Sequence, residues 1–113
     1  MGFGNWLIDW KRVPTEAVMA AKIDVEKKSE GEFLVRVTEG KSATSHRVTI
    51  RKEDYQRLTL GKITQEELLN RSFGFLLEHE SKESILPQFD LMVIGRYFPS
   101  YEKEMRKRLE VME

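Results

Sequence analysis

The sequence predicts an α+β fold, in which a three-stranded antiparallel sheet over about residues 22–51 is followed by four or five helices packed on one face. Two observations predict this order. Residues 22–51 alternate apolar and polar side chains with a period of two, which is typical of half-buried strands. From about Lys52 onward, apolar side chains recur every three or four residues, which is typical of helices with one buried face.

Three short segments carry the strand pattern: KIDVEK from Lys22, FLVRVT from Phe33 and HRVTIR from His46. Gly31 and Gly40 lie between these segments and permit the tight turns of a meander. One parity of side chains in each segment is expected to face the core, namely Ile23, Val25, Phe33, Val35, Val37, His46, Val48 and Ile50.

The helical part divides at local start and stop signals. The segment KEDYQRL is expected to form one or two turns, and Thr64 and Glu67 have the spacing of a capping box that starts a longer helix. Ser81 and Asp90 are expected to begin shorter turns, and Pro99 to start the last helix. The inward side chains are expected to be Tyr55, Leu58, Leu68, Leu69, Phe73, Leu76, Leu77, Tyr101, Met105, Leu109 and Met112.

The segment Leu91–Phe98 has almost no polar face. A helix that is apolar all round is buried on most sides, so this segment is expected to be the central element of the core. Gly95 is expected to let a neighbouring segment approach closely. Arg96 is the one charged residue in the run, and it has two interpretations. It pairs with a carboxylate or caps a carbonyl, because an unpaired buried guanidinium is very costly, or it holds an anionic ligand where two helices meet.

The composition indicates one domain over residues 1–113, with 1–21, 22–51 and 52–113 as its three blocks. Lysine plus arginine and aspartate plus glutamate each number 19, so the chain lacks the basic excess of a dedicated nucleic-acid binder. The absence of cysteine excludes disulfides, thiolate metal sites and cysteine nucleophiles. No apolar run has the length that crosses a bilayer, so we expect a cytoplasmic protein without a membrane partner.

An aromatic stripe lies within the first ten residues. Phe3, Trp6, Leu7 and Trp10 fall at helical spacing and would share one face. Because tryptophan is enriched at interfaces, we expect this stripe to be an interface. It would dock on the chain's own core, on a second copy of the chain or on a different partner, and these three alternatives stay open.

The outward face of the predicted sheet carries a candidate binding surface. Arg36, Arg47 and Arg51 share outward parity with two threonines, and such a face can bind phosphates or acidic chains. Asp24 and Glu26 have outward parity too and would neutralise part of this charge. A mixed, solvated face is therefore the alternative interpretation.

No group of residues predicts catalysis, a metal site or a cofactor. The two histidines are His46, which has inward parity at a strand end, and His79, which lies near the end of a predicted helix. His46 is expected to be a half-buried histidine with satisfied nitrogens, and His79 to be favoured by the helix dipole. We expect no catalytic and no metal-binding residues, because no converging set of side chains can be assembled.

Two segments of the helical part, SFGFLLEHESKESIL (Ser72–Leu86) and FDLMVIGRYFPSYEKE (Phe89–Glu104), resemble small bacterial proteins of unknown function. In those proteins a strand pair similarly precedes the helical tail. The resemblance implies a bacterial origin and a similar fold, and it implies no activity, cofactor or catalytic residue.

The sequence thus predicts a protein-binding or regulatory module without catalytic activity. Its expected partner is a protein, a second copy of the chain included. Binding of nucleic acid or another anion through the basic sheet face is the alternative, and a small enzyme is a second alternative.

Overall fold

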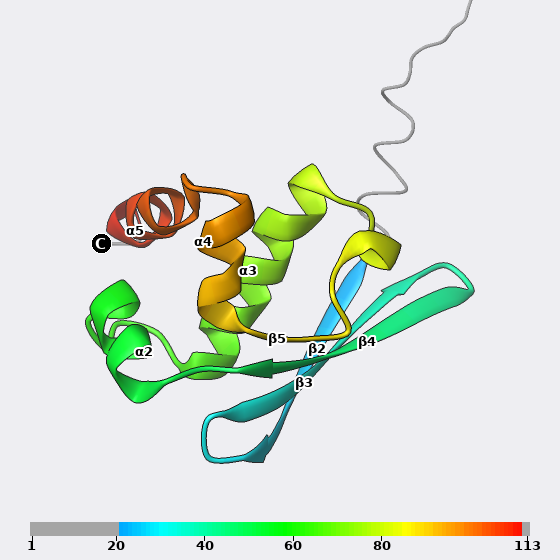
Figure 1. Cartoon of the computed structure of the whole chain (residues 1–113), viewed down its shortest axis with the longest axis horizontal. Helices are drawn as coiled ribbons and strands as arrows, with labels where there is room; N and C mark the ends of the chain where they lie inside the picture. The colour runs from blue at the N-terminus through cyan, green and yellow to red at the C-terminus, as the bar shows by residue number, and fades with distance from the viewer. Residues whose placement is uncertain (1–20, 112–113) are drawn as a thin grey trace, which may run out of the picture.

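The computed structural model describes residues 21–111, which form one mixed sheet with the helices on one side (Figure 1). The sheet has the order β2-β3-β4-β5, whose strands are β2 (Lys22–Ser29), β3 (Glu32–Glu39), β4 (Ser42–Thr49) and β5 (Gln88–Asp90). The first three strands pair antiparallel, and β5 runs parallel to β4. The α+β class is confirmed, and so is the three-stranded meander.

The fourth strand, β5, corrects the predicted three-stranded sheet. Parallel pairing requires a long crossover, and here the chain from β4 to β5 passes through two helices. The backbone N–H of Arg47 donates to the carbonyl of Pro87 (2.8 Å), which aligns the two strands. Because β5 has only three residues, its sequence shows no alternation that predicts a strand.

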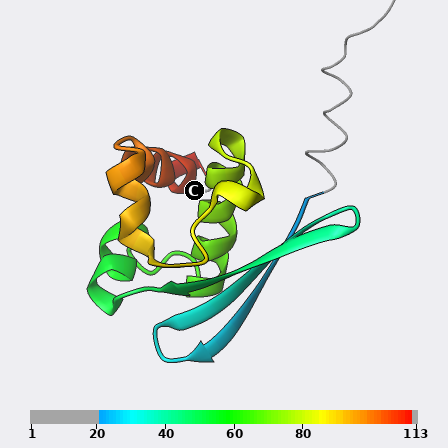
Figure 2. The same cartoon turned by 45° about the vertical axis from the view of Figure 1, so that its right-hand side comes forward.

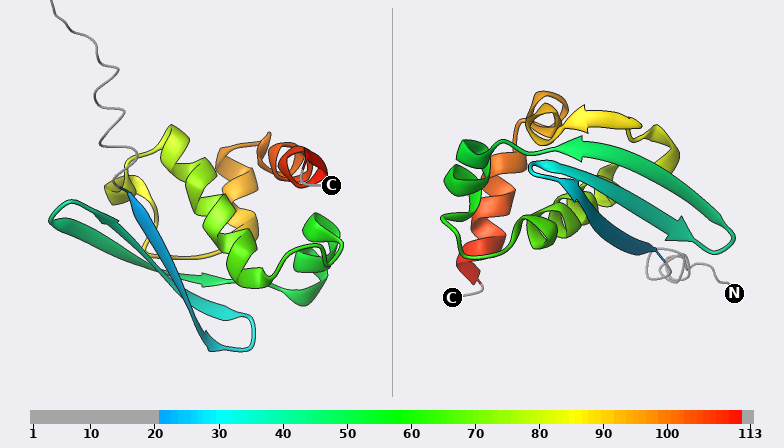
Figure 3. Two further views of the ribbon diagram at one scale, coloured as in Figure 1. Left: turned by 180° about the vertical axis from the view of Figure 1, so that it is seen from behind. Right: turned by 90° about the horizontal axis from the view of Figure 1, so that it is seen from below.

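Four α-helices are described: α2 (Lys52–Thr59), α3 (Gln65–His79), α4 (Ile94–Tyr97) and α5 (Tyr101–Val111). Two 3₁₀ turns, η1 (Lys82–Ser84) and η2 (Leu91–Val93), precede β5 and α4. Figure 2 shows the helices gathered over one face of the sheet, and the view from below in Figure 3 shows the other face free of described helices. None of these helices is long and apolar enough to cross a membrane.

The predicted inward parity of the strands is confirmed. Phe33, Val35, Val37 and Val48 are fully buried, and Ile50 is nearly so. Ile23 and Val25 on β2 point the same way but are only half-buried, because β2 is an edge strand. The alternation therefore identified the core side of the sheet correctly.

Helix α3 is the central helix of the core, in place of the predicted segment Leu91–Phe98. Its start is the expected one, since the Thr64 hydroxyl accepts from the N–H of Glu67 (3.0 Å). Its buried residues cover more than one stripe of the helix, and they are Leu68, Leu69, Ser72, Phe73, Phe75 and Leu76. A buried hydrogen bond between Ser72 and the Tyr101 hydroxyl (2.6 Å) joins α3 to α5.

The segment Leu91–Phe98 lies at the surface on one side, and the prediction that it is buried on most sides is wrong. It is a 3₁₀ turn followed by one short helix, and only Leu91 and Ile94 are buried, three residues apart. Arg96 is exposed and Tyr97 is 67% exposed. Nothing lies within 4 Å of a Cβ built on Gly95, so that glycine does not serve a close approach.

Candidate functional site

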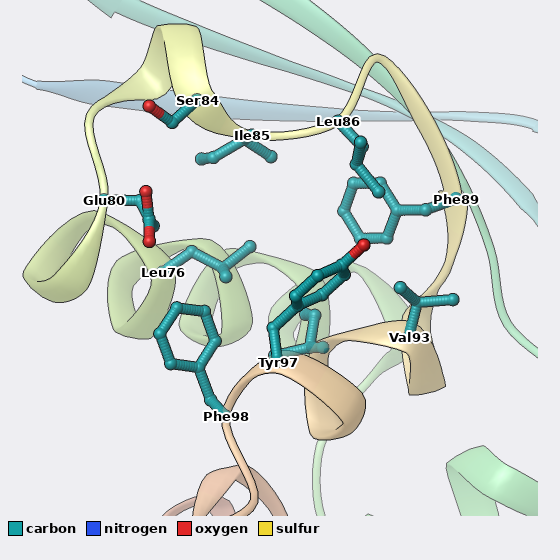
Figure 4. A pocket seen from close by; sticks show the side chains of 10 residues that line it. Leu76, Glu80, Ser84, Ile85, Leu86, Phe89, Val93, Tyr97 and Phe98 are labelled. Carbon is teal, nitrogen blue, oxygen red and sulfur yellow. The ribbon is translucent and has the colours of Figure 1, made fainter.

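An apolar pocket of about 270 Å³ opens between the end of α3, the η1–β5 connection and α4 (Figure 4). All but two of its lining side chains are aliphatic or aromatic, and the two polar ones are Glu80 and Ser84. Figure 4 shows the Tyr97 ring rising from α4 with its hydroxyl directed towards Leu86 and Phe89. The full lining is Leu76, Glu80, Ser84, Ile85, Leu86, Phe89, Val93, Ile94, Tyr97 and Phe98.

Helical periodicity places the side chains that form two walls of the pocket. Leu76 and Glu80 are four residues apart at the end of α3, so they lie one above the other on one side of the pocket. Ile94, Tyr97 and Phe98 supply the facing side with the spacing of one helical turn. The Phe98 ring meets the Phe75 ring edge to face, with centroids 5.8 Å apart, and this contact ties the two sides together.

Buried polar groups position the connection between η1 and β5. His46 is 2% exposed; its Nδ1–H donates to the carbonyl of Leu86 (2.8 Å), and its Nε2 accepts from the Thr44 hydroxyl (2.8 Å). A carbonyl can only accept, so Nδ1 of His46 carries a proton. Both ring nitrogens of His46 are therefore satisfied, as predicted, but the residue is buried rather than half-buried. It holds the Leu86 backbone at the pocket edge.

Lys82 links η1 to the sheet through an ion pair. Its ammonium pairs with Glu83 and with Glu39 (3.2 Å) at the end of β3, while its side chain is almost fully buried. The hydrogen bond to Glu83 is the main reason that the pKa of Lys82 is raised, because the pair favours the charged form. The η1 wall of the pocket is thus anchored to β3 by a buried cation.

Exposed apolar surface concentrates at this pocket. Among the described residues, the large hydrophobic side chains that remain exposed are Leu60 (67%), Leu86 (42%) and Tyr97 (67%). Leu86 and Tyr97 both line the pocket, whereas Leu60 lies at the end of α2. Exposed apolar side chains around a concave apolar surface mark sites of interaction. The sequence signal for this site is the apolar excess of Leu91–Phe98, which the helical pattern alone assigns to the core.

The predicted basic residues of the sheet divide into two environments. Arg36 and Arg47 lie on the outward face in diagonal positions, because Arg36 pairs in register with Ser45 and Leu34 with Arg47. Arg47 forms an ion pair with Glu32 (3.0 Å), and Asp24 lies opposite Arg36 on β2. Arg51 lies beyond the strand, at the start of α2, and does not join them. The outward face therefore carries charges of both signs.

Arg51 instead forms part of an ion-pair network around Asp54. The buried carboxylate of Asp54 accepts from Arg51 Nε (3.2 Å) and from Arg57 Nη1 (2.8 Å), and Arg57 also contacts Glu102 on α5 (3.3 Å). Burial raises the pKa of Asp54, but the hydrogen bonds from Arg57 and Arg51 outweigh it and leave the pKa below its ordinary value. The network joins α2 to α5.

This lowered pKa predicts a pH-dependent contribution to stability. A carboxylate with a depressed pKa in the folded state stabilises the fold above its unfolded pKa, and the contribution is lost as the pH falls through the folded value. Asp54→Asn is expected to cost about 1–2 kcal/mol at pH 7, towards the low end for charged hydrogen bonds because both arginines are exposed. Urea unfolding should show this difference shrinking from roughly pH 5 downward.

Asp24→Asn is the matched control for Asp54→Asn, because Asp24 is exposed on the outward face of β2. It should change stability little at either pH. A cost for Asp54→Asn that is equal at pH 7 and pH 3 would contradict the proposed role of the charged carboxylate.

The remaining predicted residues have the following places. Phe3, Trp6, Leu7 and Trp10 lie outside the described residues. His79 is the last residue of α3, as expected, with its ring 4.8 Å from the Phe75 ring and 5.1 Å from the Phe98 ring. Within residues 21–111, no three histidine or carboxylate side chains gather in a way that would hold a metal ion.

Comparison with known proteins adds no relative, since no protein-family model, curated protein or solved structure matches this chain.

Proposed function

We propose that the chain is a protein-binding module whose apolar pocket, between α3 and α4, takes a short aromatic segment of a partner protein. The observation that carries this proposal is the placement of Leu86 and Tyr97, two of the most exposed large apolar side chains described, on the edge of one apolar pocket. A partner that covers these side chains removes apolar surface from water, and this burial favours binding. Among the described residues of the outward sheet face, which carries charges of both signs, no large apolar side chain is exposed to the same degree.

The size of the pocket favours an anchoring side chain over a whole small molecule. Its volume of about 270 Å³ lies just below the range of roughly 300–1,000 Å³ that is usual for small-molecule sites. One or two aromatic or large aliphatic side chains from a peptide segment would fill it. Deep burial of one such anchor is the usual source of affinity at a protein interface.

Charge adds a second requirement on the partner. The Glu80 carboxylate lines the pocket and forms no hydrogen bond or ion pair with another described residue, whereas the Ser84 hydroxyl is bonded to the Ser81 hydroxyl (3.1 Å). A basic residue next to the aromatic anchor would pair with Glu80 as the pocket closes. The favoured occupant is therefore an aromatic residue flanked by lysine or arginine.

The test compares partners captured from the native host by three forms of the full chain: wild type, Tyr97→Glu and Leu60→Glu. Tyr97 and Leu60 are equally exposed, so both substitutions should leave thermal stability close to wild type. We expect at least one protein to be captured by wild type and Leu60→Glu and to be lost with Tyr97→Glu. A synthetic peptide from that protein, containing its aromatic segment, should then bind wild type in calorimetry and bind Tyr97→Glu at least about tenfold more weakly.

Identical captured sets for all three forms would overturn the proposal. So would a captured protein whose binding peptide lacks an aromatic residue. Loss of a dimer in Tyr97→Glu alone, measured as mass in solution, would replace the foreign partner by a second copy of this chain. The expectation of a bacterial cytoplasmic protein stays a prediction.

A further inference from the structure

A hollow of about 840 Å³ lies on the side of α4 that faces away from the apolar pocket. Ile94 and Tyr97 of α4 line the apolar pocket, whereas Gly95 and Arg96 line this hollow, so the short helix separates the two. The first part of α5 forms the facing wall. Gly95 has no side chain and nothing lies within 4 Å of a Cβ built on it, so the space between α4 and Pro99 stays open.

Four cations line this hollow, and they come from two helices. Lys103, Arg106 and Lys107 are at positions i, i+3 and i+4 of α5, which places them on one face of that helix. The turn through Pro99 brings Arg96 of α4 beside them. The rise of a helix places Lys103 and Lys107 about 6 Å apart along the axis. The cations therefore form a short array rather than a point charge.

Three of the four cations of this array have no carboxylate partner among the described residues. Glu102 is the one carboxylate of the lining, and it is already engaged by Arg57 (3.3 Å) and by Arg106 (3.6 Å). Arg96, Lys103 and Lys107 form no ion pair with any other described residue. The chain as a whole has equal numbers of acidic and basic residues. A neutral chain thus gathers a local positive excess on one concave surface.

Elsewhere in the described part of the chain, most arginines have a carboxylate partner. Arg47 pairs with Glu32, Arg71 with Glu67 and Arg108 with Glu78. Paired charges of this kind contribute little to recognition, because they are already compensated and solvated. A concave surface with unpaired cations instead raises the local concentration of anions.

We propose that this hollow binds a compact anion that carries two or three linked phosphate groups. Guanidinium groups recognise phosphate oxygens with paired N–H donors, and ammonium groups add point charges, so Arg96 with Lys103 and Lys107 forms a suitable set. Arg106 lies beside them but shares its charge with Glu102. The array spans one short helix and little more than one turn of α5, which suits a short chain of phosphates better than a long polymer. This site is separate from the partner pocket and does not depend on it.

The test is calorimetric titration of the full chain with inorganic tripolyphosphate at about 50 mM salt. The hollow variant is Arg96→Gln with Lys103→Gln, and the matched control is Arg36→Gln with Lys41→Gln. Both remove two charges from exposed residues that have no described ion-pair partner, so the change in net charge is the same. We expect the hollow variant to bind about tenfold or more weakly and the control to change by less than about twofold. Raising salt to about 200 mM should weaken wild-type binding.

The proposal would be overturned if wild type did not bind tripolyphosphate at millimolar concentration, or if both variants bound it equally weakly. It would also be overturned if a single-stranded oligonucleotide bound more tightly than tripolyphosphate and its binding depended on Arg96 and Lys103 in the same way. A nucleoside triphosphate that binds as tightly as tripolyphosphate would support recognition of phosphate alone. One that binds more tightly would support a nucleotide as the source of the phosphate chain. Unchanged thermal unfolding of both variants will separate lost binding from lost folding.

Discussion

Phe73→Ala is expected to lower the free energy of unfolding by about 3–5 kcal/mol, the range for removing a large aromatic side chain from a core. Phe73 lies near the middle of α3 and is fully buried. Its ring centroid is 5.4 Å from that of His46 on β4 and 6.1 Å from that of Phe89 on β5. The substitution therefore leaves a cavity where the central helix meets two strands.

Urea unfolding followed by far-ultraviolet circular dichroism would measure this loss, because the signal reports the helices and strands. Phe73→Leu is the control, since it keeps most of the apolar volume and should cost less than half as much. The midpoint should fall in both variants while the slope with urea stays the same. A loss of only a few tenths of a kcal/mol for Phe73→Ala would contradict the central place of α3.

Ile94→Ala is expected to cost about 2–5 kcal/mol, because Ile94 is 3% exposed and anchors α4 to the core. If Leu91–Phe98 were buried on most sides, as the sequence predicts, Phe98→Ala would cost a similar amount. The structure changes this expectation, since Phe98 is only half-buried and packs on Phe75 and His79 at the pocket edge. Phe98→Ala should therefore cost roughly half as much as the same change in a fully buried phenylalanine.

Tyr97→Ala completes this comparison within one helix. Tyr97 is 67% exposed, so its removal should change stability by no more than about 0.5 kcal/mol. The same urea experiment on the three variants gives the order Ile94, Phe98, Tyr97 from largest to smallest loss. Equal losses at Ile94 and Tyr97 would mean that α4 is buried on both sides, and the apolar pocket would then be closed.

The candidate sites were only partly predictable. Sequence parity assigned Arg36 and Arg47 correctly to one outward face, because alternation is a property of each strand. It could not show that Arg47 meets Glu32, which is a neighbour only through strand pairing. Arg96 was expected to be buried because its sequence neighbours are apolar. Its actual environment depends on which side of α4 meets the core, and this is decided by distant segments.

Local periodicity was sufficient for the strands β2 to β4, for their inward residues and for the start of α3 at Thr64, since each depends on side chains within a few positions of one another. The pairing of β5 with β4, the choice of α3 as the central helix, and the surface position of α4 depended on the tertiary structure. The pairing of β5 with β4, for example, joins residues about forty positions apart, such as Thr49 and Asp90. An apolar run such as Leu91–Phe98 records only that its side chains avoid water, and whether the core or a partner covers them is set by how much of that core α3 already fills.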